Sequence, residues 1–292
     1  MSQTFRVNTN VGALKAYYQL AKVNEQTQKA QLRLSSGKRI QNVADDTSGF
    51  NVGSALERKV NTMTAALGNI GSAKDMLATA EGALLGISEL LTKIEGKMAD
   101  AQDPAKDRSA IASDITALAK EIDNILKSTR FNETNLLSGA GAAGEGSKDQ
   151  NFIFQIGAIS NETLMVNFAT GVAGSGGYQS AFSASLSNFA SASAGSIATD
   201  TATSLQANLT TLKNAITTAL GNIGNFVQRL NVKEDFLNTA VANAKSSTSR
   251  IFDTDFALES LNALRGQILS QSATSMMAQL NAAPQNVLAL FR

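Results

Sequence analysis

Two adjacent carboxylates, Asp45 and Asp46, follow Arg39 closely in the sequence and are the first candidates for chemistry. Paired carboxylates can serve as a general acid and base, or can bind a divalent cation. The pair also stands directly before a helical pattern, where the helix dipole stabilises negative charge. Because no other acidic cluster lies nearby, we favour a helix start over a metal or catalytic site, with Arg39 forming an ion pair in the same segment.

The sequence contains neither histidine nor cysteine. The lack of His excludes a Ser-His-Asp triad, a HExxH zinc site and any imidazole base. The lack of Cys excludes thiol catalysis, cysteine-bound zinc and disulfides, so stability does not depend on redox conditions. Carboxylates, Lys, Ser and Tyr remain as reactive groups. We nevertheless expect a structural protein with no enzymatic activity, no cofactor and no metal site.

The net charge of the 292 residues is +1, but positive charge gathers at the start of the chain. Residues 1–44 carry seven Lys or Arg against Glu25 alone. A basic arm can bind nucleic acid, but without interleaved aromatic residues or a known motif we expect no such partner. The pattern predicts no membrane insertion and no cleaved signal peptide, which alone would favour the cytoplasm unless an uncleaved sequence directs secretion.

A long helix is the strongest prediction from the hydrophobic pattern. Apolar residues recur at alternating steps of three and four, as in the core of a coiled coil. They are Met63, Ala66, Ile70, Ala73, Leu77, Ala80, Leu84, Ile87, Leu91, Ile94, Met98 and Ala101. At about 1.5 Å per residue this helix would be roughly 58 Å long, so it must be one rod of a bundle.

Two further segments continue this spacing. Asp103 and Pro104 predict the start of an antiparallel neighbour, because Asp can cap a helix and Pro suits its first position. Its apolar positions are Ile111, Ile115, Leu118, Ile122 and Ile125. A second long seam, the natural partner of the first, comprises Leu205, Leu209, Leu212, Ile216, Ala219, Ile223, Phe226 and Leu230. We therefore predict a mainly α fold, a long antiparallel bundle or coiled coil of N- and C-terminal segments.

The pattern changes between the helical segments, after Phe131. LLSGAGAAGEGSKDQ is typical of a loop, and the alternating apolar residues of NFIFQIG and TLMVNF predict a small β-hairpin. From Gly171 to Asp200 the chain is rich in Ser, Ala and Gly, which predicts a short exposed excursion.

Both ends of the chain carry apolar stripes that a monomer would expose. One begins with Val11, Leu14 and Tyr18, and the other, broader stripe includes Leu264, Ile268, Met276 and Leu280. Val287, Leu288 and Phe291 extend the apolar content to the last residues. Exposed apolar stripes usually mark interaction sites, but the two helices could also cover each other or fold back on the bundle. The pattern alone leaves both interpretations open.

Two long segments carry a resemblance to a known family. LSSGKRIQNVADDTSGF, residues 34–50, resembles the signature near the start of bacterial flagellins, and SRIFDTDFALES with NAAPQNVLALFR resembles their C-terminal end. FNETNLLSG and FQIGA also look like flagellin segments, so the resemblance covers about residues 1–170 and 205–292. It implies a structural subunit that self-assembles into the flagellar filament for swimming motility. A hook-filament junction protein and a generic secreted coiled-coil protein are the alternatives.

The resemblance also implies a layout and a route. Residues 1–44 and 251–292 would form an inner coiled-coil domain with a spoke near 34–46. Residues 45–170 and 201–250 would form a helical outer domain with the hairpin, and 171–200 a short variable insertion. The implied route is export of the unfolded chain through the flagellar secretion channel to the cell exterior. Implied partners are other copies of the chain, an export chaperone, the filament cap protein and hook-filament junction proteins.

The terminal helices are then the expected assembly surface. A lone amphipathic helix gains little to offset its ordering cost, so we expect both ends to become ordered on assembly. The candidate assembly residues are Val11, Leu14, Tyr18, Leu264, Ile268, Met276, Leu280, Val287, Leu288 and Phe291. Arg39, Asp45 and Asp46 are the expected residues of the spoke and helix start.

One segment departs from the family pattern. Many flagellins carry an Arg-x-Arg-Glu run, read by a vertebrate innate receptor, where this chain has LLTKIEGKMADAQ. Lys93 keeps the first charge, but Glu95 reverses the second and Gly96 replaces the acidic residue. A reversed charge at a contact costs binding through repulsion and unpaired buried groups. We therefore expect weak recognition by that receptor.

Overall fold

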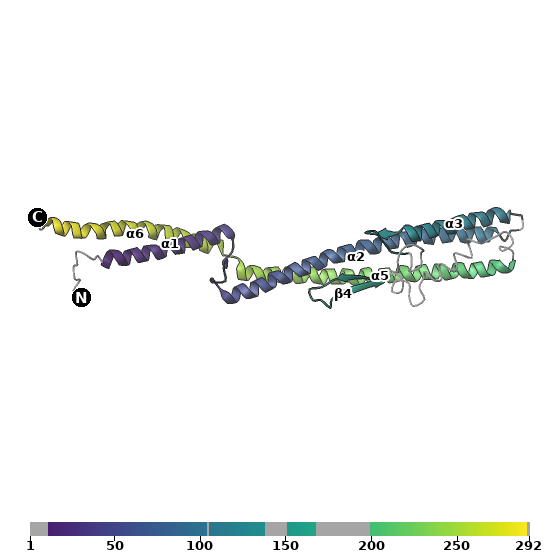
Figure 1. Cartoon of the computed structure of the whole chain (residues 1–292), viewed down its shortest axis with the longest axis horizontal. Helices are drawn as coiled ribbons and strands as arrows, with labels where there is room; N and C mark the ends of the chain where they lie inside the picture. The colour runs from purple at the N-terminus through teal and green to yellow at the C-terminus, as the bar shows by residue number, and fades with distance from the viewer. Residues whose placement is uncertain (1–10, 104, 138–150, 168–198, 291–292) are drawn as a thin grey trace. The chain divides into compact units, whose positions relative to one another are not determined.

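The computed structural model describes residues 11–103, 105–137, 151–167 and 199–290, with the backbone alone for 151, 199–204 and 283–290. Its helices are α1 (Val11–Ser36), α2 (Thr47–Asp100), α3 (Arg108–Ser128), α5 (Thr199–Phe252) and α6 (Phe256–Leu290). Its strands are β1 (Arg130–Phe131), β2 (Thr134–Asn135), β3 (Asn151–Gln155) and β4 (Thr163–Asn167) (Figure 1). The predicted mainly α class, with long antiparallel helices and a small β region, is confirmed.

The chain forms two compact units. Unit 1 comprises Met1–Val60 and Ala242–Arg292, and unit 2 comprises Asn61–Val241. Helices α2 and α5 contribute residues to both, because each runs without interruption for 54 residues. The predicted insertion at 171–200 lies outside the described residues, apart from its last two positions, which belong to α5.

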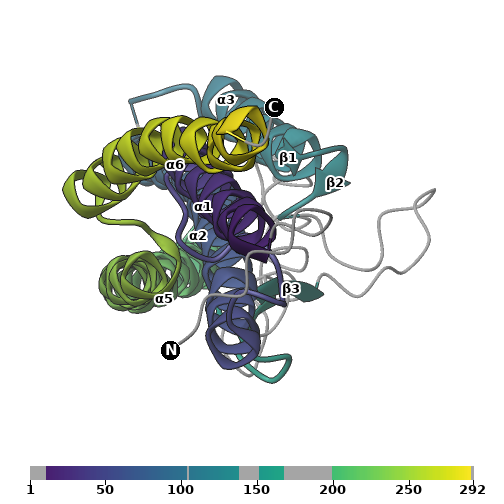
Figure 2. The same cartoon turned by 90° about the vertical axis from the view of Figure 1, so that its left-hand side faces the viewer.

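The core of unit 2 follows the predicted seams. All twelve seam residues from Met63 to Ala101 are buried, and so are the seam residues of α5 from Leu205 to Leu230 except Phe226, which is half-buried. Ion pairs join α2 to α5 from Lys74 to Glu234 and from Glu95 to Lys213. As the residue number rises on α2 it falls on α5, so these helices are antiparallel neighbours (Figures 1 and 2).

Helix α3 also packs in unit 2, but its start differs from the prediction. Ile111, Ile115 and Ile122 are buried, and Lys97 of α2 pairs with Asp114 at 2.6 Å. The N-cap is Asp107, whose Oδ1 accepts from the backbone N–H groups of Ser109 and Ala110. The predicted start at Asp103 and Pro104 is therefore wrong. Asp103 instead accepts from the N–H of Ala105, and Pro104 lies outside the described residues.

Two small antiparallel hairpins complete unit 2. The first joins β1 to β2 through Asn132 and Glu133, both at positive φ, which suits a two-residue hairpin turn. The second is the predicted β3–β4 hairpin, which buries Leu164 and Val166. The Nδ2 group of Asn69 on α2 donates to the Gln155 carbonyl at 2.9 Å.

A charged contact joins the same hairpin to α5. Lys233 pairs with Glu162, beside the start of β4, at 2.8 Å. The hydrogen bond from Lys233 lowers the pKa of the Glu162 carboxyl, which keeps this carboxylate ionised. The hairpin is therefore held to both long helices of unit 2, through Asn69 and Lys233.

Candidate assembly interface

The terminal helices α1 and α6 lie side by side in unit 1 (Figures 1 and 2). Asn24 accepts a hydrogen bond from Ser270 at 3.0 Å, and Arg33 pairs with Glu259 at 3.6 Å, so the two helices are antiparallel. The buried or half-buried positions again follow steps of three and four. Between Val11 and Ala30 they are Ala13, Ala16, Leu20, Val23, Thr27 and Ala30, and between Ala263 and Leu280 they are Ala263, Gly266, Ser270, Ala273, Met277 and Leu280.

Small side chains at this seam let the two helices approach closely. Gly266 is buried, and a Cβ placed on it would lie only 2.1 Å from the Thr27 hydroxyl oxygen. Only glycine fits at this point. A seam rich in Ala, Gly, Ser and Thr buries little apolar surface per residue, so the pair gains modest stability from its own contact.

Many of the larger apolar side chains point away from this seam. Val11, Leu14 and Tyr18 of α1 are between 51% and 66% exposed, although the sequence pattern singled them out as an apolar stripe. Leu264, Ile268 and Met276 of α6 are between 56% and 59% exposed. Most seam positions thus carry small residues, with Leu20, Val23, Met277 and Leu280 as the larger ones. Many large apolar side chains lie on the outside, which departs from the usual amphipathic helix.

The remaining candidate residues fall elsewhere. Leu280 is half-buried, at the end of the seam. The side chains of Val287 and Leu288 and all of Phe291 lie outside the described residues. More exposed apolar side chains extend the outward surface beyond the predicted set, namely Tyr17, Leu32, Phe256, Leu258, Leu261 and Leu269.

A short backbone clamp ties the end of α1 to the start of α6. Gly37, at φ +69, ends α1 in the left-handed conformation that glycine tolerates best. The Arg39 N–H donates to the Phe252 carbonyl at 2.6 Å, and the Thr254 N–H donates to the Gly37 carbonyl at 2.9 Å. The Arg39 guanidinium donates to the Ile251 carbonyl at 3.0 Å. Arg39 therefore stabilises the clamp through backbone carbonyls.

The two carboxylates of the predicted spoke have separate structural tasks. Asp46 precedes α2, and its Oδ1 accepts from the Gly49 N–H at 2.8 Å, as an N-cap does. Asp45 accepts from the backbone N–H groups of Gln41 and Asn42 in the preceding turn. These two hydrogen bonds lower the pKa of the Asp45 carboxyl, because they favour its charged form.

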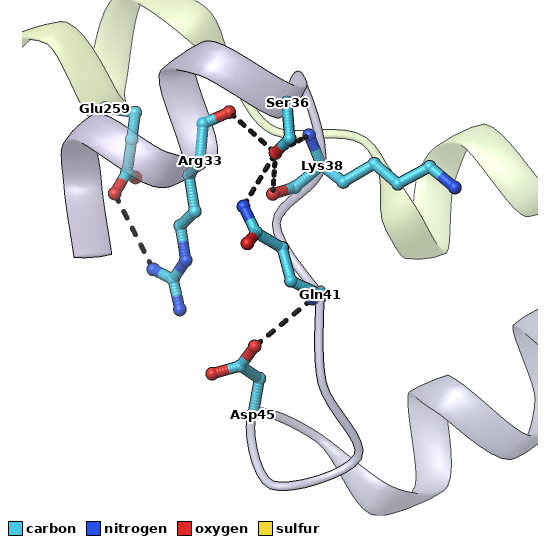
Figure 3. A network of polar contacts seen from close by, with 6 residues as sticks. All are labelled: Arg33, Ser36, Lys38, Gln41, Asp45 and Glu259. Carbon is cyan, nitrogen blue, oxygen red and sulfur yellow. Dashed lines mark hydrogen bonds and ion pairs between the residues drawn. The ribbon is translucent and has the colours of Figure 1, made fainter. Parts of the chain in front are cut away.

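Figure 3 follows the polar contacts from α6 through the end of α1 into this turn. The Glu259 side chain is only 7% exposed and reaches Arg33. The Ser36 hydroxyl oxygen accepts from the Lys38 N–H and from the Gln41 amide at 2.7 Å. Glu259 lies in the first turn of α6 and Arg33 in the last turn of α1, so each charge also complements the dipole of its own helix.

Phe252 fills a tight site beside the clamp. Its ring lies edge-on to Phe50, with ring centroids 6.2 Å apart, and Lys38 lies over its face at 5.3 Å. A Cβ placed on Gly53 would lie 2.3 Å from the Phe252 ring. The ring therefore requires glycine at position 53. Ile40, which is also buried at 2% exposed, lies close to Gly49.

The chain matches two models of one protein family. Residues 7–142 match the bacterial flagellin N-terminal helical region, and residues 206–291 match the bacterial flagellin C-terminal helical region. The chain belongs to the bacterial flagellin family. As a flagellin it is a structural protein of the flagellar filament, which confirms the family and the broad function expected from the sequence.

Relatives of this flagellin align along almost their full length. Flagellin from Bacillus subtilis (strain 168) is 31% identical over 304 residues, which cover 98% of this chain and 100% of that protein. The flagellar filament 33 kDa core protein of Treponema phagedenis is 29% identical, with 98% and 99% covered. Flagellin from Listeria monocytogenes is 30% identical, with 96% and 97% covered.

The segment that departs from the family pattern, with Lys93, Glu95 and Gly96, lies on α2 in unit 2. Lys93 pairs with Glu89 at 2.9 Å, one helical turn away, and Glu95 forms an ion pair with Lys213 of α5. Gly96 is exposed, and a Cβ there would meet nothing within 4 Å. Glu95 thus has a partner within the chain, and the helix surface at Gly96 presents backbone where a side chain would fit.

Neither a membrane-spanning helix nor a metal-binding cluster appears among the described residues of this flagellin. Among its described residues, no helix combines the length and the hydropathy needed to cross a bilayer. In the same part of the chain, no three acidic side chains gather closely enough to hold a metal ion.

Proposed function

We propose that this flagellin polymerises into the filament through the outward faces of α1 and α6. The observation that carries the proposal is the packing of these helices, which places Leu264, Ile268 and Met276 in solvent while Ala263 and Gly266 occupy the seam. Large apolar side chains on the outside of a helix pair need a partner, and in a homopolymer that partner is another copy. The role is structural rather than catalytic.

Assembly and helix formation are coupled in this proposal. The small residues of the α1–α6 seam supply little burial, so the terminal segments of the free chain gain most of their order from neighbouring subunits. Val11, Leu14 and Tyr18 of α1 belong to the same outward surface. Leu280, at the end of the seam, and Val287, Leu288 and Phe291 complete the proposed set of assembly residues. Residues 1–44 and 251–292 then act as the inner domain, and residues 45–170 and 201–250 as the outer domain.

Terminal segments that become ordered only on assembly are compatible with export of the chain in an unfolded state. A chain without Cys forms no disulfide, so it can pass a narrow secretion channel unfolded and reach the cell exterior. A dedicated export chaperone would cover the apolar surface of α6 until export. The filament cap protein would guide each arriving subunit, and hook-filament junction proteins would join the first subunits to the hook.

Seeded growth tests the proposal against the junction-protein alternative. We expect purified chain to extend short filament seeds into micrometre filaments, because each added subunit buries the outward faces of α1 and α6. Electron microscopy of seeded and unseeded samples measures this growth. A junction protein would cap the seeds and stop there, so seeds that never lengthen would refute the filament-subunit role.

We also propose that the innate receptor for flagellin recognises this chain weakly. Glu95 carries the opposite charge to the family pattern and is held by Lys213, and Gly96 offers no carboxylate. We expect low potency in a receptor reporter assay, and a gain in potency for the double variant Glu95→Arg/Gly96→Glu. Potency of the unchanged chain equal to that of a flagellin with the full pattern would contradict this expectation.

A further inference from the structure

Unit 2 carries two apolar surfaces that its own fold leaves in solvent. On α5, Val232 and Phe236 are 71% and 61% exposed, and their spacing of four places them on one face of the helix. On the β3–β4 hairpin, Ile153 and Met165 are cross-strand partners and are 65% and 58% exposed. We call these the α5 patch and the hairpin patch.

Two charges beside the α5 patch already have partners within the chain. Lys233 pairs with Glu162 and lies over the Phe236 ring at 5.3 Å, while Glu234 pairs with Lys74. A pair of large apolar side chains surrounded by charged residues, two of them already paired, has the composition of an interface centre with a polar rim. Burial of this patch would leave neither Lys233 nor Glu234 without a partner.

The hairpin patch is uncharged. Its strands alternate, so Leu164 and Val166 are buried while Thr163 and Met165 are exposed. The cross-strand partners on the outward side are Ile153 with Met165 and Gln155 with Thr163, all neutral. The hairpin is also held in place through Asn69 and Lys233, so it presents these side chains from a fixed support.

We propose that the α5 patch of one subunit binds the hairpin patch of a neighbouring copy in the filament. This inference rests on the proposed polymerisation but concerns unit 2 rather than the terminal helices. An open helical polymer is built from heterologous contacts, in which one surface of a subunit meets a different surface of the next. Two unlike apolar patches on one unit, with no charge to repel each other, meet this requirement.

Cross-linking between copies tests the contact in the full chain, which has no cysteine of its own. One variant carries Val232→Cys and the other Met165→Cys. Filaments grown from each variant alone are the reference samples. We expect oxidised filaments grown from a mixture to give a disulfide-linked dimer at a yield about tenfold or more above filaments of either variant alone, because neighbours in a filament have millimolar effective concentrations. Leu85→Cys, at an exposed apolar residue of α2, replaces Met165→Cys in the matched control mixture.

Growth and cross-linking are read separately. If the cysteine variants and the unchanged chain all fail to extend seeds, the proposed polymerisation is wrong. If filaments grow but the mixture gives no more dimer than the Leu85→Cys control, the contact between patches is wrong. Equal dimer from one variant alone would overturn the heterologous pairing, and normal growth of Phe236→Ser with reduced secretion would assign the patch to an export partner instead.

Discussion

The double variant Leu264→Asp/Ile268→Asp is expected to lose seeded filament growth while the chain keeps its helical content. Both side chains are more than half exposed on the outside of the α1–α6 pair, so aspartate there meets water in the free chain. In the filament the same carboxylates would be buried against a neighbouring subunit. Each lost apolar contact is worth about 1.5–3 kcal/mol, so the critical concentration should rise by about tenfold or more per substitution.

Two controls show whether the loss of growth comes from the lost apolar side chains or simply from an added negative charge. Leu264→Met/Ile268→Leu keeps the apolar volume and should support growth at the original critical concentration. Ser113→Asp adds a carboxylate at an exposed position of α3 and should also leave growth unchanged. Sedimentation of polymer against protein concentration gives the critical concentration of each variant. Growth of the double aspartate variant at the original critical concentration would refute the assembly role of the α6 outward face.

Sequence periodicity identified most of the helical core of unit 2. The stripe from Met63 to Ala101 is buried at every position, because α2 has its packing partners within the same chain. When an apolar stripe has only intramolecular neighbours, the residues that pattern analysis selects are those that become buried. The same reasoning located the β3–β4 hairpin from alternation alone, since Leu164 and Val166 face inward and Met165 outward.

Periodicity selected the other face of α1. The predicted stripe starts at Val11, Leu14 and Tyr18, whereas the residues facing α6 include Ala13, Ala16 and Leu20. An offset of two residues is roughly 200° around a helix, so these are opposite faces. Pattern analysis favours large apolar residues and passes over Ala, Gly and Thr. It therefore detected the outward apolar surface and missed the small-residue seam that pairs the helices.

Most of the clamp was also beyond sequence reasoning. The motif around residues 34–50 was evident from the sequence. Its residues are held by contacts with residues more than two hundred positions away, such as Ile251 and Phe252, which the sequence does not reveal. Gly53 is needed because the Phe252 ring occupies the space of its Cβ, and nothing local in the sequence reveals this. Buried Glu259 likewise depends on Arg33 from the other end of the chain. Asp46 was foreseeable, since an N-cap is a local interaction.

Deletion of residues 281–292 is expected to abolish filaments without unfolding unit 2. The deleted segment contains three of the ten candidate assembly residues, Val287, Leu288 and Phe291, and belongs to unit 1. The seams of α2, α3 and α5 that form the core of unit 2 are untouched, so its thermal unfolding midpoint should not move. Circular dichroism melting and seeded growth, measured on the same preparation, report the two effects.

A variant in the core of unit 2 should destabilise that unit but leave filament growth intact, which is the opposite of what we expect from the deletion. Ile87 is fully buried in unit 2, and Ile87→Ala should lower the free energy of unfolding by about 2–5 kcal/mol through lost burial and a cavity. It leaves α1 and α6 unchanged, so seeded growth below the melting temperature should persist. Our proposal requires that the deletion abolishes filaments without destabilising unit 2, and that Ile87→Ala destabilises unit 2 without abolishing filaments. The reason is that unit 2 forms its own core, whereas the terminal helices bury their apolar faces against neighbouring subunits. Normal filaments from the deletion, or a lowered unit 2 melting midpoint in it, would contradict that proposal.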